Sequence, residues 1–408
     1  MAATDTAFLV KTRAYAQKLA TWSKKAQYTV PESALAIIQD ADYQQAIRTA
    51  LQPFKAVRRV VLVGIGGSSL GTEAVYNALK TPKSPALTVL DSIERDAFDA
   101  LESDLQALGA PEELALVIVS KSGDTIETML NASLALEIAK KRFGAGVLDR
   151  VICIGNDGTP FLENAQKQHL RTFSIPTAIG GRYSVFTAAG MVPLTLLGID
   201  TRALLSGAQS ALTPAHLRAS AEQAAALAWH AESGANIVNF FTFNDRLETL
   251  GYWYRQLLAE SIGKTTDAEG KPFRHSLLPT VSTAQDLHSV AQLYLSGYHG
   301  IFTQFLYADE KPSLRVPTHW LTEGVHLHGK THTAVRCALR DGVLAAYKEQ
   351  NLPHTYRELQ KIDAHTIGEL MAGFMVEVMC YAHAFNINAF DQPNVELYKA
   401  HARTALAK

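Results

Sequence analysis

Short apolar runs alternate along the chain with longer stretches in which apolar residues recur every three or four positions. Runs with the length of buried strands lie at residues 57–63, 86–90, 114–120 and 150–154. Helical spacing follows the first and third of these runs, at 72–80 and 125–141. Strands and helices that alternate at this length predict a parallel, doubly wound sheet.

The same alternation resumes after a loop with Pro and Gly near residue 175 and a turn at 212–217. Strands are expected at 237–243, 277–281, 300–308 and 353–359, and helices at 247–262 and 285–296. Further helices are expected at 5–26, 32–50, 206–233, 331–350 and 364–385. The predicted fold class is therefore α/β, with a helical segment at 1–50, α/β units at 51–205 and 206–390, and an exposed C-terminal helix within 391–408.

The composition is that of an ordinary globular protein, because 47% of the 408 residues are hydrophobic and 19% are charged. A net charge of −1 argues against nucleic acid or an anionic membrane as a partner. Two of the three cysteines, Cys153, Cys337 and Cys380, lie in apolar stretches, which favours buried free thiols in a reducing compartment. With no signal peptide and no run of transmembrane length, we expect a cytoplasmic protein.

The stretch 114–134 ends a strand in the loop 120–125 and begins a helix directly after it. The first amides of a helix are unpaired, its dipole is positive there, and hydroxyls add donors, so this loop suits an anion. The alternative is an ordinary turn in which Asp124 is the N-cap and Glu127 completes a capping box. A carboxylate is an awkward neighbour for an anion, so we expect Asp124 to cap the helix from outside the pocket.

A glycine-rich turn at 64–71 follows the first strand and departs from the common nucleotide motifs. A dinucleotide fingerprint fails because Ser69 stands where the third glycine belongs, and a P-loop fails because Thr72 replaces the lysine. What remains is a turn in which the backbone at Gly66 and Gly67 can be approached closely, with the Ser68 hydroxyl beside it. Both turns lie at the carboxyl ends of parallel strands, so together they suit a small phosphate ester held by amides and hydroxyls.

Candidate catalytic side chains lie in a helix of the second unit and in the loop near residue 175. Gln256 and Glu260 share one helix face, and a carboxylate among apolar neighbours near a helix end suits proton transfer. The alternative is a solvent-facing Glu260 paired with Lys264. Two glycines precede Arg182 and let the chain aim this cation inward, or it is an ordinary surface arginine. His288, taken alone, could be a histidine on a helix face without a role, which is the more common fate of a lone histidine.

Three histidines close together, His326, His328 and His332, suggest a metal site at first sight. Their spacing matches no zinc motif, and no paired carboxylate accompanies them. We interpret them as a polar surface and expect no metal.

Six motifs in this order resemble those of the glucose-6-phosphate isomerase family. They are Gly64-Ile65-Gly66-Gly67-Ser68 with Leu70-Gly71, Ser120-Lys121-Ser122 with Thr125 and Glu127-Thr128, Gly180-Gly181-Arg182-Tyr183-Ser184, Gln256-x-x-x-Glu260-Ser261-x-Gly263-Lys264, Gln285-Asp286-x-His288, and Phe390-Asp391-Gln392 with Val395-Glu396 and Lys399. The match spans residues 60–399. Six separated motifs in the correct order are far more specific than any one of them.

The resemblance implies two sugar-isomerase (SIS-type) α/β/α sandwich domains with mainly parallel sheets. It implies reversible aldose–ketose isomerisation of glucose 6-phosphate and fructose 6-phosphate, a reaction of glycolysis and gluconeogenesis, without metal, nucleotide or other cofactor. It also implies a homodimer whose active sites lie at the subunit interface.

Carried over by motif, the residues that bind the sugar phosphate would be Gly67, Ser68, Ser120, Lys121, Ser122, Gly123, Asp124, Thr125 and Thr128. Glu260 would move a proton between C1 and C2 through an enediolate that Arg182 stabilises. His288, contributed by the partner chain, and Lys399 would open the sugar ring. Gln256 would help to position the substrate. These roles agree with the chemistry, since proton abstraction beside a carbonyl needs a carboxylate base and a cation where negative charge develops.

Two rival functions can be weighed against this one. A non-catalytic sugar-phosphate sensor predicts a missing base or acid, yet Glu260, His288 and Lys399 all stand at the motif positions. No basic patch or DNA-binding module accompanies them. An isomerase acting on mannose 6-phosphate or an amino sugar stays open, because specificity at C2 depends on a pocket shape that sequence spacing does not reveal.

Overall fold

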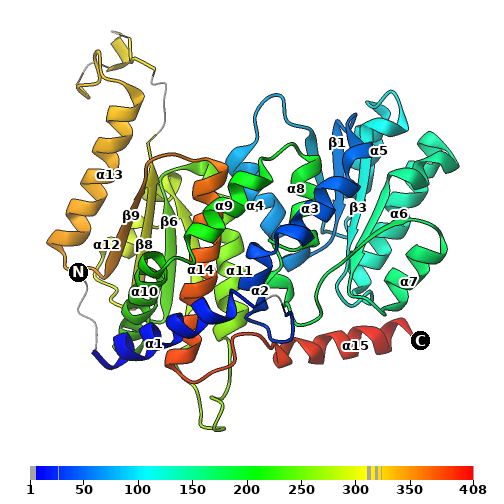
Figure 1. The fold of residues 1–408 in the computed structure, drawn as a ribbon. Helices are drawn as coiled ribbons and strands as arrows, with labels where there is room; N and C mark the ends of the chain where they lie inside the picture. The colour runs from blue at the N-terminus through cyan, green and yellow to red at the C-terminus, as the bar shows by residue number, and fades with distance from the viewer. Residues whose placement is uncertain (1–5, 26, 310–313, 318–319, 323, 408) are drawn as a thin grey trace.

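The computed structural model describes residues 6–25, 27–309, 314–317, 320–322 and 324–407 (Figure 1). Its first sheet has the strand order β2-β1-β3-β4-β5, and every pairing in it is parallel. The strands are β1 Arg59–Val63, β2 Ala86–Leu90, β3 Leu114–Val119, β4 Val151–Gly155 and β5 Arg171–Ser174. The apolar runs predicted the first four; β5 is a short, half-buried and mostly polar edge strand that leaves no such run.

The second sheet has the order β7-β6-β8-β9 and is likewise parallel throughout. Its strands are β6 Ile237–Thr242, β7 Leu278–Thr283, β8 Ile301–Ala308 and β9 His354–Leu359. All four were expected. Strand β8 is buried along its whole length because it has a neighbour on each side and helices over both faces.

Helices surround both sheets. The α-helices are α1 Thr6–Trp22, α2 Ser33–Ala36, α3 Ala41–Ala50, α4 Leu70–Leu79, α5 Arg95–Gln106, α6 Ile126–Phe143, α7 Pro160–Lys167, α8 Ala188–Leu196, α9 Thr201–Ser210, α10 Pro214–Glu232, α11 Glu248–Ile262, α12 Ala291–Leu295, α13 His332–Glu349, α14 Ala364–Ala384 and α15 Glu396–Leu406. Single 3₁₀ turns that matter for the site are η3 Gly66–Ser68, η6 Gly181–Tyr183 and η8 Ala284–His288. Helices α4, α9, α11 and α14 lie between the two sheets (Figure 1).

Apolar packing explains why the two sheets stay together. One continuous cluster joins residues on β1, such as Val60 and Leu62, to residues on β6 and β8, such as Phe240 and Phe302, through the helices between the sheets. Separate clusters cover the outer face of each sheet. The α/β fold class with mainly parallel sheets is therefore confirmed.

Several predicted boundaries were wrong. The helix expected at 32–50 is broken at Asp40, whose side chain accepts a hydrogen bond from the Tyr43 amide at 2.8 Å and caps α3. The helix expected at 206–233 consists of α9 and α10, with Pro214 opening the second. In the part of the chain that the structure describes, no helix combines the length and the apolar character needed to cross a membrane.

Candidate active site

The turn after β1 brings two glycines close to neighbouring segments. Gly66 has a φ of +59°, and a Cβ built there would lie 2.9 Å from Nε2 of Gln256. A Cβ on Gly67 would lie 2.3 Å from the carbonyl carbon of Gly181. Only glycine can occupy such positions without displacing a neighbour. The close backbone approach expected at this turn is therefore confirmed.

The turn after β3 is shaped by two residues that do not line the cavity. Buried Ser120 accepts at Oγ a hydrogen bond from the Gly123 amide, at 3.1 Å. Gly123 has a φ of +77°, and a Cβ there would lie 2.4 Å from Cβ of Phe161. Thr128 is also buried, one turn into α6. Ser120 and Gly123 thus form the shape of the turn, while the side chains that line the cavity are those of Lys121, Ser122, Asp124 and Thr125.

The expectation that Asp124 caps the helix from outside the pocket is wrong, and the alternative of a capping box is not formed either. The N-cap of α6 is Thr125, and its side chain makes no capping hydrogen bond. Asp124 lines the cavity, where it accepts a hydrogen bond from the Ser122 hydroxyl and pairs with Arg403, whose Nη1 lies 3.4 Å from Oδ2. Because the N-cap side chain does not bond to them, the first amides of α6 are left for an anion.

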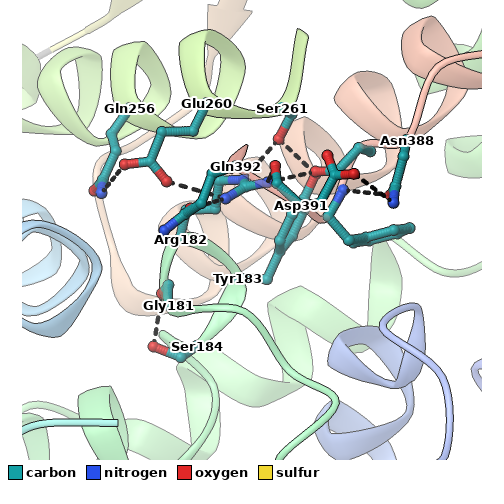
Figure 2. Close-up of polar contacts among 12 residues, drawn as sticks. Gly181, Arg182, Tyr183, Ser184, Gln256, Glu260, Ser261, Asn388, Asp391 and Gln392 are labelled. Atoms are coloured by element: carbon teal, nitrogen blue, oxygen red, sulfur yellow. Dashed lines mark hydrogen bonds and ion pairs between the residues drawn. The ribbon is translucent and has the colours of Figure 1, made fainter. Parts of the chain in front are cut away.

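Glu260 is placed by α11 with both carboxylate oxygens bonded, as Figure 2 shows. Its Oε1 accepts from Nε2 of Gln256 at 2.8 Å, and its Oε2 lies 3.0 Å from Nη1 of Arg182. The side chain is 32% exposed, toward the cavity. The alternative pair with the Lys264 ammonium is not formed, since that group reaches the backbone carbonyl of Glu260 instead. A carboxylate fixed at the wall of a cavity is arranged for proton transfer.

Arg182 is buried, which rules out the alternative of an ordinary surface arginine. Its Nε donates to Ser261 Oγ at 2.9 Å, and its Nη2 donates to the carbonyls of Ala389 and Asp391 at 2.7 and 3.1 Å. Its Nη1 is shared between Glu260 and Oε1 of Gln392 (Figure 2). The guanidinium therefore joins α11 to the segment that precedes the C-terminal helix.

Lys264 holds that segment in place from the end of α11. Its ammonium donates to the backbone carbonyls of Glu260 and Asp391, at 3.0 and 2.7 Å, and pairs with Oδ1 of Asp391 at 3.0 Å. The other carboxylate oxygen of Asp391 accepts a hydrogen bond from the side-chain Nδ2 of Asn388 at 3.0 Å (Figure 2). Burial lowers the pKa of Lys264, and the bond to Asp391 opposes that effect.

The C-terminal helix α15 carries Lys399 to the cavity. Its ammonium lies 2.8 Å from Oε1 of Glu396, three residues earlier on the same helix. That hydrogen bond raises the pKa of Lys399. Burial, with the charge of Arg182 adding to it, lowers the pKa of Lys121 across the cavity. The two lysines therefore hold their protons with different strength.

A cavity of about 590 Å³ brings these parts together. Ten of the fourteen predicted site residues line it: Gly67, Ser68, Lys121, Ser122, Asp124, Thr125, Arg182, Gln256, Glu260 and Lys399. The four that do not are Ser120, Gly123, Thr128 and His288. Ser120 and Gly123 shape the turn after β3, and Thr128 is buried in α6.

His288 lies apart from the other predicted residues. It ends the turn η8 after β7, in the second sheet, where it is exposed. Of the three clustered histidines, His326 and His328 are exposed, and Nδ1 of His332 accepts a hydrogen bond from the Leu314 amide at 2.9 Å. Within the described ranges, no group of three or more His, Cys, Asp or Glu side chains is arranged to hold a metal ion.

Comparison with known proteins decides the family. The sequence profile described as phosphoglucose isomerase matches residues 24–408. The chain belongs to this family.

Relatives in the phosphoglucose isomerase family resemble this chain over most of their length. A probable glucose-6-phosphate isomerase of Haloquadratum walsbyi is 30% identical over 367 residues, which are 88% of this chain and 82% of that protein. The glucose-6-phosphate isomerase of Methanocaldococcus jannaschii is 29% identical over 358 residues, 83% of this chain and 81% of the relative. The family and the enzyme class, an aldose–ketose isomerase, are therefore confirmed.

Solved structures agree in fold. A hypothetical protein of Thermus thermophilus superposes with a TM-score of 0.87, at 26% identity and over 100% of both chains. A glucose-6-phosphate isomerase of Chlamydia trachomatis gives a TM-score of 0.77 at 22% identity, over 98% of this chain and 78% of that one.

Three side chains that line the cavity of this member of the phosphoglucose isomerase family were given no role from the sequence. Gln392 and Glu396 belong to the last motif, but no role was assigned to either. Arg403 lies beyond every motif, although its position four residues after Lys399 places both on one helix face. That spacing was the available signal in the sequence. It indicates a site residue only when α15 is known to line the cavity.

Proposed function

We propose that the chain interconverts glucose 6-phosphate and fructose 6-phosphate in the cavity between the turns after β1 and β3, helix α11 and helix α15. The observation that carries this proposal is Glu260, which sits at the cavity wall with one oxygen on Gln256 and the other on Arg182. No metal or other cofactor is needed for a proton transfer between adjacent carbons. The exposed face of the carboxylate is where the reacting C–H bond would lie.

The phosphate of the substrate would bind at the two strand-to-helix turns. Gly67 and Ser68 offer the turn after β1, and Lys121, Ser122 and Thr125 offer the turn after β3. The start of α6 adds unpaired amides and a positive dipole end. Gln256, bonded to the base, would help to place the sugar. Binding energy from the non-reacting phosphate would then orient C1 and C2 against Glu260.

In the isomerisation step, Glu260 removes the C2 proton of the open-chain aldose. The electron pair of that C–H bond forms the C1–C2 double bond, while the π electrons of the C1 carbonyl move onto O1 to give an enediolate. The hydroxyl proton moves from O2 to O1, and Glu260 returns its proton to C1 to give the ketose. Arg182 lies beside the Glu260 carboxylate. Its positive charge stabilises the negative charge that develops on the oxygens of the enediolate. Donors fixed before the reaction are effective because little reorganisation is required.

Ring opening would need an acid at the ring oxygen and a base at the O1 hydroxyl. Lys399 faces the cavity, but His288 is exposed on the second sheet, away from it. We therefore propose a homodimer in which the partner subunit supplies the histidine and His288 acts at the ring oxygen. We also propose the division into sugar-isomerase domains at 51–205 and 206–390, each holding one sheet, and a cytoplasmic location.

A coupled assay tests the proposal. The protein is supplied with fructose 6-phosphate, and glucose 6-phosphate is detected through a dehydrogenase. We expect turnover by the wild-type chain and a loss of about 10³-fold or more in kcat for Glu260→Gln, with KM changed far less. The matched control is Glu248→Gln, on the first turn of the same helix, which bonds only to the hydroxyl of Tyr252 among the contacts described. Wild-type protein without activity at high concentration would refute the isomerase assignment, and an active Glu260→Gln variant would refute the role of Glu260.

A further inference from the structure

Asp124 places a negative charge in the turn where the substrate's phosphate would bind. Its carboxylate lines the cavity, and Nη1 of Arg403 on α15 lies 3.4 Å from its Oδ2. A carboxylate beside a phosphate dianion weakens binding, because like charges repel. The arginine that offsets this charge comes from a different part of the chain, 279 residues away in sequence.

The pair between Arg403 and Asp124 adds little to the stability of the fold. The side chains of Arg403 and Asp124 are 47% and 61% exposed, and solvent screens such a pair so strongly that it contributes little to folding. The second partner of Arg403 is Glu396, with Nη2 3.6 Å from Oε2. Neither contact uses the two-pronged geometry in which a guanidinium binds an anion most strongly. Arg403 is therefore held loosely enough to exchange one acceptor for another.

The position of Arg403 matches that of a ligand for the phosphate. It lies one helical turn beyond Lys399, and both side chains line the cavity from the face of α15 that looks onto the turn after β3. Glu396 is bonded to Lys399 and lies near Arg403, while Asp124 takes the other side of the guanidinium. The carboxylates of Asp124 and Glu396 thus neutralise the positive charges of Lys399 and Arg403, and a stronger anion in the cavity can replace them.

We propose that Arg403 is a phosphate-binding residue, and that Asp124 holds its guanidinium until the phosphate of the substrate displaces the carboxylate. The inference rests on the proposed function for the identity of the substrate. A phosphate dianion offers three oxygens to the planar guanidinium, so it forms the two-pronged contact that the single Asp124 oxygen does not. Asp124 competes for the same cation and sets the affinity of the site.

Steady-state kinetics and inhibition by inorganic phosphate test the proposal. Arg403→Gln should raise both KM for fructose 6-phosphate and the inhibition constant for phosphate about fivefold, more than it lowers kcat. Arg403→Lys should restore part of this loss. Asp124→Asn should lower both constants about threefold, because it removes the repulsion and releases the guanidinium. The matched control is Arg58→Gln, which breaks a comparable exposed pair, 3.3 Å from Glu113, outside the cavity.

The double variant separates direct contact from simple neutralisation of Asp124. If Arg403 touches the phosphate, Arg403→Gln should still weaken phosphate binding when Asp124 has already been changed to Asn. If Arg403 serves only to neutralise Asp124, its replacement has no effect in that background, and this result would overturn the proposal. Binding of inorganic phosphate by calorimetry needs no turnover. It therefore distinguishes failure of this inference from failure of the isomerase assignment.

Discussion

Replacement of Lys264 by methionine tests whether the end of α11 positions the C-terminal part of the site. The Lys264 side chain is 7% exposed, and its ammonium bonds to two backbone carbonyls and to the Asp391 carboxylate. Methionine keeps most of the aliphatic length but removes every one of these bonds. The segment around Asp391 would then lose the contact that aligns its carbonyl with Arg182.

The expected loss can be estimated from those contacts. Two hydrogen bonds from a charged donor and one ion pair disappear, but Asp391 is 50% exposed and water can solvate it in the variant. We expect a decrease of about 2 kcal/mol in the free energy of unfolding. Because Arg182 and the start of α15 both depend on this segment, kcat/KM should fall by about tenfold.

Urea unfolding and the coupled isomerase assay measure the two effects on the same preparation. Lys271→Met is the matched control, since that lysine is exposed and pairs with Glu269 at 2.6 Å, away from the cavity. The control should change neither stability nor kinetics. A Lys264→Met variant with lower stability but wild-type kcat/KM would refute the positioning role, and one with unchanged stability would refute the energetic estimate.

Two further predictions concern the partner subunit and acid pH. Mixing the inactive variants Glu260→Gln and His288→Ala under conditions of subunit exchange should restore about a quarter of the wild-type activity if sites are shared between chains; no recovery would contradict the shared site. Burial lowers the pKa of His230 from 6.5 to about 4, so the unfolded chain binds the proton more readily, and stability present above pH 6.5 is lost as pH falls toward 4. The free energy of unfolding lost in this way is at most about 3 kcal/mol. Urea unfolding at several pH values should show a smaller loss in His230→Leu, but the full loss in a control variant at exposed His299. If both variants lost the same stability on acidification, burial of His230 would not be the cause.

Local sequence patterns predicted the parts of the fold that depend on local physics. The apolar run of β3 and the helical spacing of α11 were sufficient to place Ser120 and Glu260, because burial and periodicity are properties of a single segment. The cap of α6 was mispredicted for the opposite reason. Whether Asp124 or Thr125 begins the helix depends on a turn fixed by Gly123 against Phe161, 38 residues later in sequence, and on an arginine from α15.

The hydrogen bonds that Arg182 makes within the protein limit how it can stabilise an enediolate. Five hydrogen bonds to protein acceptors already engage its donors. Two of the acceptors are backbone carbonyls of the segment tied down by Lys264, and a third is buried Ser261. The contact that can be exchanged is therefore the one from Nη1, which Glu260 and the Gln392 side chain share. Charge that develops at the substrate oxygens competes with Gln392 for this donor, so the guanidinium strengthens its interaction with the reacting centre as the proton leaves for Glu260, without moving its other bonds.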